Sequence, residues 1–243
     1  MLFRSLGLGR REHQGSADTF PEARIDIERR IVQCADRVIA ECPQDREDLL
    51  RLYGARADSI RTVPCGVDLA TFGPRDRAQA RRRLGLRDDE FVVLQLGRLV
   101  PRKGIDNVIR AVGHLRHTLG IRARLYVVGG NADSPSVAAT PEIGRLKMVA
   151  EESGVADSVT FVGRRGRDQL RQFYGASDVF VTTPWYEPFG ITPVEAMACG
   201  VPVVGASVGG IRRWPIFNRG FARNAADFSG STGLGGKRNR SGL

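Results

Sequence analysis

The sequence predicts an α/β fold built on a doubly wound parallel sheet, and three observations support this. From Phe91 onward, short apolar runs of strand length alternate with longer segments whose apolar residues follow a helical period. Glycine or proline turn signals separate most of these segments. The alternation continues long enough to predict several β–α–β units, whose right-handed crossovers place every strand's carboxyl end at one edge of the sheet.

The pattern before residue 66 is weaker and predicts a smaller unit. Residues 1–20 are basic and contain several glycines, so they predict no regular element. Spaced apolar positions among many charges then favour an amphipathic helix. Gly54 marks the end of a second helix. The elements expected are a helix over 22–35, a strand over 37–40, a helix over 45–53 and a strand over 60–63.

The larger unit begins with a strongly basic helix over 75–84, which we expect to be a solvated face. After the first long strand, the next helix places Ile105, Val108 and Val112 on one apolar stripe, as a helix packed on a sheet requires. The strands expected are 91–96, 123–128, 158–162, 178–181 and 202–204, and the helices are 105–119, 141–152, 168–174 and one opened by Thr192-Pro193.

Four loops of this unit are predicted to meet at the carboxyl edge of the sheet. Arg98, Gly129-Gly130, Gly163 and Glu187 each follow a predicted strand. Open parallel sheets bind ligands outside the carboxyl ends of their strands. The sequence therefore predicts a binding cleft bordered by these loops.

Composition limits the class of protein. The chain has 243 residues, and its 42% hydrophobic content is ample for a core. No apolar run reaches the length of a membrane span, and no signal peptide opens the chain, so we expect a cytoplasmic protein. The four cysteines lack metal or redox spacing, which favours free thiols and predicts no metal site.

The net charge of +10 raises the alternative of a basic nucleotide- or nucleic-acid-binding module without catalysis. The distribution of charge argues against it. From Ile211 onward, seven basic residues and one acid supply +6, whereas the first 210 residues hold 30 basic and 26 acidic residues, or +4. The excess charge belongs to the tail, and we expect no nucleic-acid partner.

Two glutamates mark the most informative stretch of the chain. Glu187 lies in a loop after an apolar run, and Glu195 follows eight residues later, about one turn inside a helix. Gly200 ends that helix before the last predicted strand. A loop glutamate beside the free N–H groups of a helix start forms a small polar pocket.

Two blocks of residues carry a family resemblance. Residues 187–204 read EPFGITPVEAMACGVPVV, which resembles the E-x7-E signature of retaining GT-B glycosyltransferases of the group 1 type. Residues 96–104 read LGRLVPRKG, which is similar to that family's Gly-Arg…Lys-Gly donor-phosphate loop. The similarity extends from about Ala35 to Gly210 and implies a GT-B fold, with a Rossmann-like donor domain and the remnant of a first domain.

The resemblance implies a role for each residue of these blocks. A transferase of this kind stabilises the charge that grows on the leaving diphosphate, and an Arg and a Lys can do so without a metal. Arg98 and Lys103 would serve there, and Glu187 would contact the donor sugar, so these three are the expected catalytic residues. Glu195 would bind the ribose hydroxyls. The further donor-binding residues expected are Gly97, Gly163, Phe189, Gly190 and Ile191, with Gly163 near the base, whereas we expect Arg102 to point to solvent.

Other interpretations of the same residues stay open. The two glutamates could be an acid–base pair, as in glycoside hydrolases, or Glu195 could be a structural helix residue. Arg98 could pair with a nearby acid, and Lys103 could lie on the surface. A nucleotide-sugar epimerase of GT-B fold is disfavoured by the order of the two blocks.

The resemblance implies three parts. Residues 1–65 would be the remnant of an acceptor domain, 66–210 the nucleotide-sugar domain, and 211–243 an aberrant, disordered tail that departs from the family pattern. The predicted function is transfer of a sugar, with retention, from a nucleotide-diphosphate donor to a sugar, lipid or glycan acceptor, without a cofactor. Peripheral membrane contact would come through the missing part of the first domain. The N-terminal catalytic elements of the family are not present here either, which predicts an inactive fragment.

Overall fold

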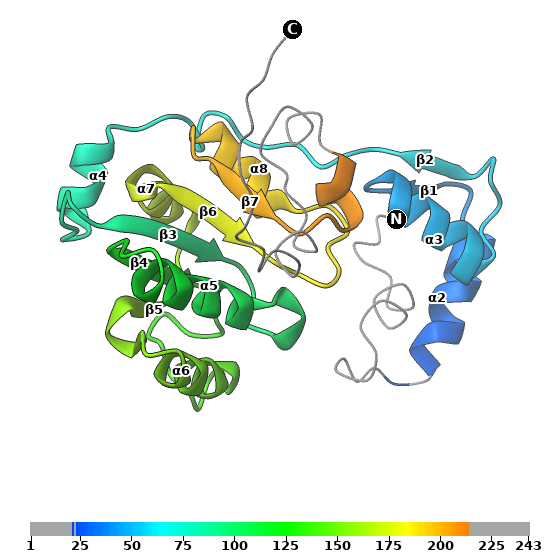
Figure 1. Cartoon of the computed structure of the whole chain (residues 1–243). Coiled ribbons are helices and arrows are strands. Elements are labelled where there is room, and N and C mark those ends of the chain that lie inside the picture. Colours follow the sequence, from blue (N-terminus) through cyan, green and yellow to red (C-terminus); the bar gives the residue numbers. More distant parts are fainter. Residues whose placement is uncertain (1–20, 22, 214–243) are drawn as a thin grey trace, which may run out of the picture.

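The computed structural model describes residue 21 and residues 23–213, and over these residues the chain is an α/β protein, as predicted (Figure 1). A five-stranded parallel sheet has the order β5-β4-β3-β6-β7, and a separate parallel pair is formed by β1 and β2. The strands are β1 (Val38–Ala40), β2 (Ile60–Thr62), β3 (Phe91–Leu96), β4 (Ala123–Val128), β5 (Val159–Gly163), β6 (Val179–Thr182) and β7 (Val203–Gly205).

Helices cover both faces of the five-stranded sheet (Figure 1). The helices are α2 (Ala23–Cys34), α3 (Pro43–Tyr53), α4 (Arg77–Arg83), α5 (Ile105–His117), α6 (Glu142–Glu152), α7 (Arg167–Ala176) and α8 (Ile191–Ala198), with 3₁₀ turns η2 (Pro101–Lys103), η3 (Ala156–Ser158) and η4 (Gly209–Arg213).

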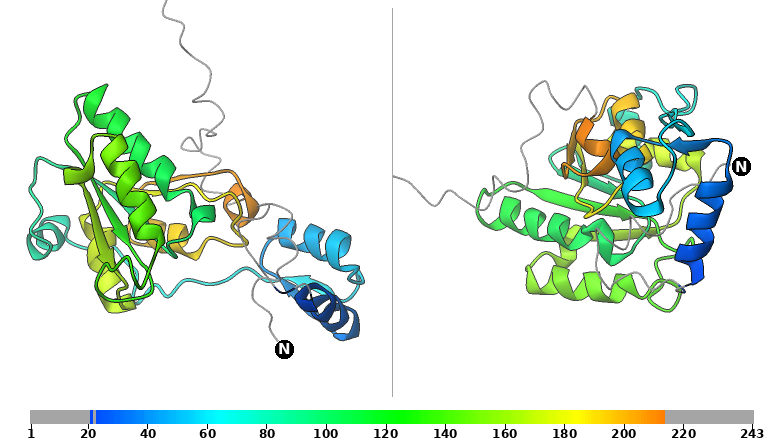
Figure 2. Two further views of the ribbon diagram at one scale, coloured as in Figure 1. Left: turned by 90° about the horizontal axis from the view of Figure 1, so that it is seen from below. Right: turned by 90° about the vertical axis from the view of Figure 1, so that its right-hand side faces the viewer.

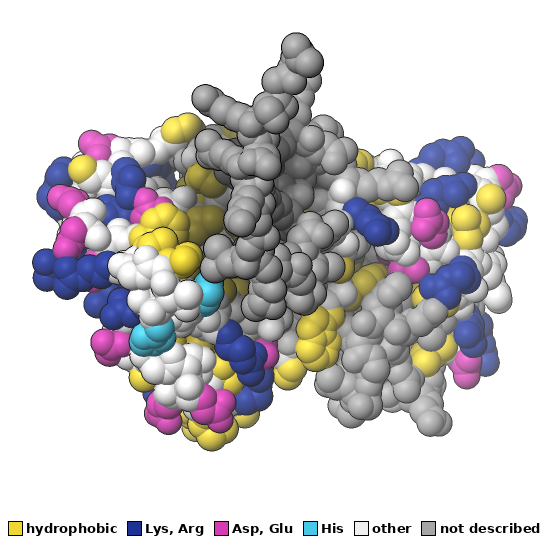
Figure 3. Space-filling view, viewed as in Figure 1, with side chains coloured by type: hydrophobic (Ala, Val, Ile, Leu, Met, Phe, Trp, Pro, Cys, Tyr) yellow, Lys and Arg dark blue, Asp and Glu magenta, His cyan; other side chains and the backbone are white. Residues whose placement is uncertain are grey.

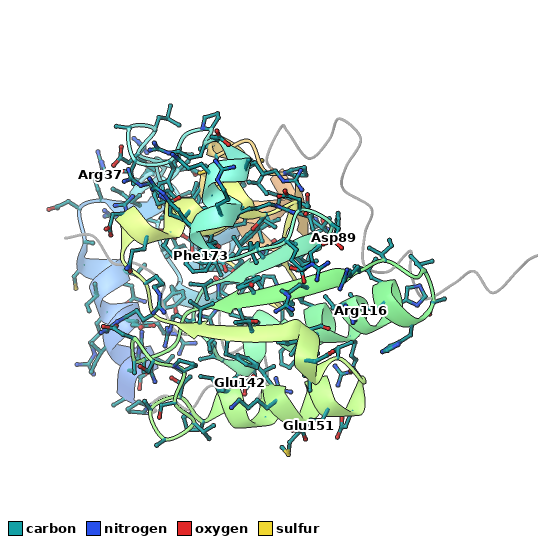
Figure 4. The ribbon with its side chains drawn as sticks, turned by 90° about the vertical axis from the view of Figure 1, so that its left-hand side faces the viewer. Arg37, Asp89, Arg116, Glu142, Glu151 and Phe173 are labelled. Atoms are coloured by element: carbon teal, nitrogen blue, oxygen red, sulfur yellow. The ribbon has the colours of Figure 1, made fainter. Side chains whose placement is uncertain are left out.

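Two apolar clusters hold these layers together. Helices α5 and α6 bury Ile109 and Leu146 against Leu125 on one face of the sheet. Helices α7 and α8 cover the other face, where Phe173 of α7 points toward the sheet (Figure 4) and its ring centroid lies 6.4 Å from that of Tyr126. Apolar side chains thus alternate between the two faces of β3 and β4, as the two-residue period of a strand requires.

The small unit lies beside the large one and is joined to it by an extended segment over 63–76 (Figure 2). Helices α2 and α3 pack on β1 and β2 through Val32, Leu49 and Ile60. Inside this unit the Tyr53 hydroxyl donates to Glu28 Oε2 over 3.0 Å. Helix α3 also contacts η4, so the two units touch close to the carboxyl edge of the large sheet.

The expectation that the basic helix over 75–84 is simply a solvated face is wrong at Arg81, whose side chain is 2% exposed. Its guanidinium donates to Asp178 Oδ2 over 2.6 Å and to the carbonyl oxygens of Ala176 and Glu90 over 3.2 and 3.1 Å. A guanidinium can be buried when its N–H groups find acceptors in this way. The charge pattern alone could not reveal that one arginine of the helix faces inward.

The folded structure continues past Gly210, where we expected the native fold to end. The turn η4 runs to Arg213, and Ile211 is buried in the apolar cluster under α7 and α8. The rest of the predicted tail, 214–243, lies outside the described residues, as does the irregular segment predicted over 1–20. Among the helices described, none has both the length and the hydropathy needed to cross a bilayer.

Candidate functional site

A cavity of about 380 Å³ opens at the carboxyl edge of the large sheet, where the loops after β3 and β6 meet. Arg98 and Lys103 line it from the first loop and Glu187 from the second. Glu41 and Cys65 line it from the small unit. The structure therefore brings the three predicted catalytic residues to one cavity between the two units, where the other lining residues are Gly97, Arg102, Pro188, Phe189, Gly190, Ile191 and Thr192.

The loop after β3 is shaped by Gly104, which follows η2. Its φ is 60°, in the left-handed region, and a Cβ there would lie 2.1 Å from the carbonyl oxygen of Thr183. Only glycine fits this position without displacing the neighbouring backbone. The Thr183 hydroxyl donates to the Gly104 carbonyl over 2.6 Å. The loops after β3 and β6 are thus held in direct backbone contact.

Arg98 is the open cation of the cavity. It is exposed, and it lines both the main cavity and a neighbouring one of about 280 Å³. Its side chain forms no hydrogen bond or ion pair with any residue that the structure describes. The alternative that Arg98 pairs with a nearby acid therefore has no support in this part of the chain, and its guanidinium is available to an anion.

Lys103 and Glu187 form an ion pair across the cavity, between the ammonium group and Oε2. Their side chains are only 14% and 16% exposed, so Lys103 is not a surface residue. The pair joins loops that are 84 residues apart in sequence. Each group neutralises the other, and a ligand that uses one of them changes the electrostatic environment of its partner.

Arg102 does not point to solvent as expected, because its side chain is turned toward the second loop and is 7% exposed. Its guanidinium donates to the Tyr186 carbonyl over 3.4 Å, and its own carbonyl accepts from the Trp185 amide over 2.9 Å. The η2 turn directs Lys103 to the cavity and its neighbour Arg102 to the backbone beside Glu187. Arg102 therefore connects the two loops that carry the site.

The start of α8 supplies backbone donors. Gly190 precedes the helix with φ 85° and ψ 61°, a left-handed conformation that glycine adopts without strain. No side chain caps this helix, so the first N–H groups of α8 are not used by a cap. Phe189 is buried and Ile191 is partly exposed beside them. A helix start of this kind favours an anionic ligand.

Glu195 lies one turn behind Ile191 and Thr192, two residues that line the cavity, and is 7% exposed. Its Oε2 accepts a hydrogen bond of 2.9 Å from the Tyr174 hydroxyl, which the sequence did not lead us to expect. Burial raises the pKa of Glu195, while the Tyr174 hydrogen bond and the charge of Arg167 act in the opposite direction. A tyrosine in an apolar helix face is no signal for such a contact, since the two residues meet only in the folded chain.

Gly163 ends β5, and a second cavity of about 280 Å³ lies at this end of the sheet. The φ of Gly163 is 87°, and a Cβ there would lie 2.2 Å from the Asp133 carbonyl oxygen. The cavity is lined by residues that directly follow Gly163 and by the Gly-Arg pair of the first loop. The lining residues are Leu96, Gly97, Arg98, Val128, Gly129, Gly130, Arg164, Arg165 and Leu170.

No cluster of three or more His, Cys, Asp or Glu side chains that could hold a metal ion occurs in residues 21 and 23–213. Of the cationic side chains that line the cavity, Arg102 donates to the Tyr186 carbonyl, while Arg98 and Lys103 offer their guanidinium and ammonium groups. These groups and the start of α8 could together bind a doubly or triply charged anion.

Comparison with known proteins agrees with this arrangement. Residues 76–215 match the family model described as Glycosyl transferases group 1, and residues 7–71 match the model of Glycosyltransferase Family 4. The D-inositol 3-phosphate glycosyltransferase of Acidothermus cellulolyticus is 43% identical over 194 residues, which are 79% of this chain and 42% of that protein. The chain spans about half the length of the curated relatives it matches.

Solved structures give the same picture. Sucrose-phosphate synthase from Thermosynechococcus elongatus is 36% identical with a TM-score of 0.75, and the match covers 87% of this chain and 50% of that one. Anabaena HepE, solved in complex with UDP and glucose, is 26% identical with a TM-score of 0.69, and the match covers 79% of this chain and 50% of that one.

Proposed function

We propose that this chain, which belongs to the glycosyl transferases group 1 family, binds a nucleotide-diphosphate sugar in the cavity between its two units. In the whole protein, this site would transfer the sugar to an acceptor with retention of anomeric configuration. The observation that carries the proposal is the convergence of Arg98, Lys103 and the uncapped start of α8 on one cavity. Cationic side chains and free N–H groups at a helix start are groups that bind phosphates in proteins.

The diphosphate would lie between the two cations. Arg98 offers a forked set of donors without a competing acid in the described residues, and Lys103 offers a point charge. During transfer the bond between the anomeric carbon and the phosphate oxygen breaks, and negative charge grows on that oxygen. Both cations act where this charge develops, which is the most effective place for electrostatic stabilisation.

The donor sugar would lie at Glu187. In the protein without ligand, Glu187 is held by Lys103. Once the diphosphate takes the ammonium group as its partner, the carboxylate of Glu187 becomes free to accept hydrogen bonds from sugar hydroxyls. For retention, the acceptor hydroxyl attacks from the face that the diphosphate leaves, its oxygen bonds to the anomeric carbon, and its proton passes to the leaving phosphate oxygen.

The nucleoside would extend toward α7 and the end of β5. Glu195 would accept hydrogen bonds from the ribose hydroxyls, and the base would occupy the second cavity near Gly163 and Leu170. The size of that cavity, about 280 Å³, is of the order expected for part of a small ligand. Because HepE was solved with UDP, uracil is the first base to test.

The acceptor would approach from the small unit, whose Glu41 and Cys65 face the same cavity. The relatives' names identify an inositol phosphate acceptor for those proteins, and this chain spans about half of their length. A nucleic-acid-binding module is not favoured. On the face shown in Figure 3, basic side chains lie at both ends of the molecule and are interspersed with acidic ones.

Calorimetric titration of the whole chain with UDP, GDP, ADP and their sugar conjugates tests the proposal. We expect saturable binding of one nucleotide, weakened at least tenfold by Lys103→Ala and by Glu195→Ala. The matched control is Lys147→Ala, which removes an exposed lysine of α6 far from the cavity in sequence and should leave affinity unchanged. A folded protein that binds none of these nucleotides would contradict the proposal.

A further inference from the structure

We propose that Tyr174 is a positioning residue for nucleotide recognition, because its hydroxyl fixes one oxygen of Glu195 and leaves the other oxygen for the ribose. The inference rests on the proposed function, in which Glu195 binds the ribose hydroxyls of the donor. Neither sequence motif includes Tyr174, which lies on α7, 21 residues before Glu195.

The hydrogen bond itself is buried. The Tyr174 hydroxyl lies 2.9 Å from Glu195 Oε2 and 3.2 Å from the Thr192 carbonyl oxygen in the first turn of α8. A phenol has a single proton to donate, and a carboxylate is a stronger acceptor than a neutral carbonyl. The proton therefore goes to Glu195, and the contact ties α7 to the helix that borders the cavity.

The ring of Tyr174 cannot move away from this position easily. It is fully buried, and Phe72 meets it edge-on, with ring centroids 5.9 Å apart and planes at 84°. On β6, Phe180 lies at the same centroid distance with an interplanar angle of 49°. Aromatic pairs of this geometry are favourable, and close packing permits few alternative rotamers.

The second oxygen of Glu195, Oε1, differs from Oε2 in its contacts. Within the described residues, Oε1 accepts no hydrogen bond, and it is not one of the fully buried polar atoms without a partner. It therefore reaches accessible space, one turn behind Ile191 and Thr192 at the wall of the cavity. A carboxylate with one oxygen held and the other open is a preorganised acceptor for a hydroxyl group.

Two neighbours of this acceptor counteract the effect of its burial. Burial raises the pKa of Glu195, and the Tyr174 hydrogen bond and the positive charge of Arg167 oppose that rise. The Arg167 guanidinium carbon lies 5.4 Å from the centre of the Phe72 ring, the same ring that packs on Tyr174. Burial and the nearby carboxylate raise the pKa of Tyr174 well above its usual value, so it stays a donor.

The test compares ribose with deoxyribose. Titrations of the whole chain measure Kd for the nucleoside diphosphate that binds best among UDP, GDP and ADP, and for its 2′-deoxy counterpart. A hydrogen bond from a hydroxyl to a carboxylate corresponds to about a 10- to 100-fold preference for the ribonucleotide in the unmodified chain. We expect Tyr174→Phe to lower this preference at least threefold, and Glu195→Gln to abolish most of it.

The matched control is Tyr53→Phe, which removes a buried tyrosine–glutamate hydrogen bond of 3.0 Å in the small unit. It should lower the melting temperature by a similar amount and leave the ribose preference unchanged. A folded Tyr174→Phe protein that binds both nucleotides more weakly with the original preference would overturn the inference, because Tyr174 would then only stabilise the fold. If the unmodified chain binds no nucleoside diphosphate, the proposed function itself fails. If it binds without ribose preference, the ribose contact of Glu195 is wrong.

Discussion

Glu187 and Glu195 are eight residues apart and are held by opposite means. A cation, Lys103, holds Glu187 in a loop, whereas a neutral phenol, Tyr174, holds Glu195 on a helix. Lys103 is also proposed to bind the donor, so a bound diphosphate would replace Glu187 as the partner of its ammonium group. Tyr174 is fully buried and has no other proposed role. The difference suggests that the sugar and phosphate end of the site rearranges on binding, while the ribose end is preformed.

The largest effect is expected when Lys103, the partner of Glu187, is replaced. Lys103→Ala takes away a diphosphate contact and leaves Glu187 with a mostly buried, uncompensated charge. Loss of a charge-stabilising donor of this kind costs about 10²–10³ in rate. Donor affinity, which depends on the ground state alone, should fall at least tenfold in calorimetry. Unchanged affinity in the folded variant would show that Lys103 does not contact the donor.

A third carboxylate sharpens the comparison. Asp45 is half-buried in the first turn of α3, and within the described residues its side chain has neither a cation nor a phenol as its partner. Burial raises its pKa from 3.8 to about 6, and only the Glu41 amide, 2.9 Å from Oδ2, opposes this as a hydrogen-bond donor. A raised carboxyl pKa means that the folded state binds a proton more tightly than the unfolded state, so ionisation opposes folding.

For Asp45, the destabilisation is therefore absent below pH 4 and complete above pH 6, and it amounts to at most about 3 kcal/mol. We expect the free energy of unfolding of Asp45→Asn, relative to the unmodified chain, to rise across this window. Urea denaturation at pH 4, 5, 6 and 7 measures the difference. Parallel pH profiles of the two proteins would show that Asp45 titrates normally.

A smaller effect is expected from Arg102, which joins the two loops at the wall of the cavity. Arg102→Ala removes the contact to the Tyr186 carbonyl, and we expect a loss of about 1–2 kcal/mol in stability, since hydrogen bonds to charged groups contribute about that much. Donor affinity should fall by less than for Lys103→Ala. Arg102→Lys is the control, because lysine keeps the positive charge but lacks the planar set of N–H donors of the guanidinium group. Wild-type melting temperature in Arg102→Ala would contradict this role.

The smallest change in stability is expected when both members of the ion pair are replaced. The double variant Lys103→Met/Glu187→Gln leaves no unpaired charge, so its free energy of unfolding should lie within about 1 kcal/mol of the unmodified value. Donor binding should nevertheless be lost. If the double variant is less stable than Lys103→Ala alone, the pair serves the fold rather than the site.

Much of the large unit could be predicted from sequence. The predicted strands 91–96 and 123–128 have the observed bounds of β3 and β4, because both are continuous apolar runs between turn signals. Helix α5 begins as predicted at Ile105 but ends at His117, two residues earlier than predicted. Leu119 is exposed and gives the helix no further apolar contact. Local patterns thus predict the elements well and their last residues less well.

The positions of Arg81 and Arg102 could not be predicted in the same way. Both are buried arginines within basic stretches, where local charge favours exposure. Each is buried because carbonyl or carboxylate oxygens from distant segments accept its N–H groups, for example the carbonyl of Ala176, 95 residues from Arg81. No short window of sequence contains Arg81 together with Ala176, or Arg102 together with Tyr186.

The sequence by itself determined the α/β class, the order of its elements, the two loops that carry Arg98, Lys103 and Glu187, and the helix that carries Glu195, since apolar period, glycine position and motif spacing are local properties. Only the tertiary structure decided which partner each charged group takes. Lys103 meets Glu187 across 84 residues, and Tyr174 meets Glu195 from another helix. These choices depend on burial, because a group removed from water must find its partner among whatever side chains and backbone groups the packed chain brings within reach.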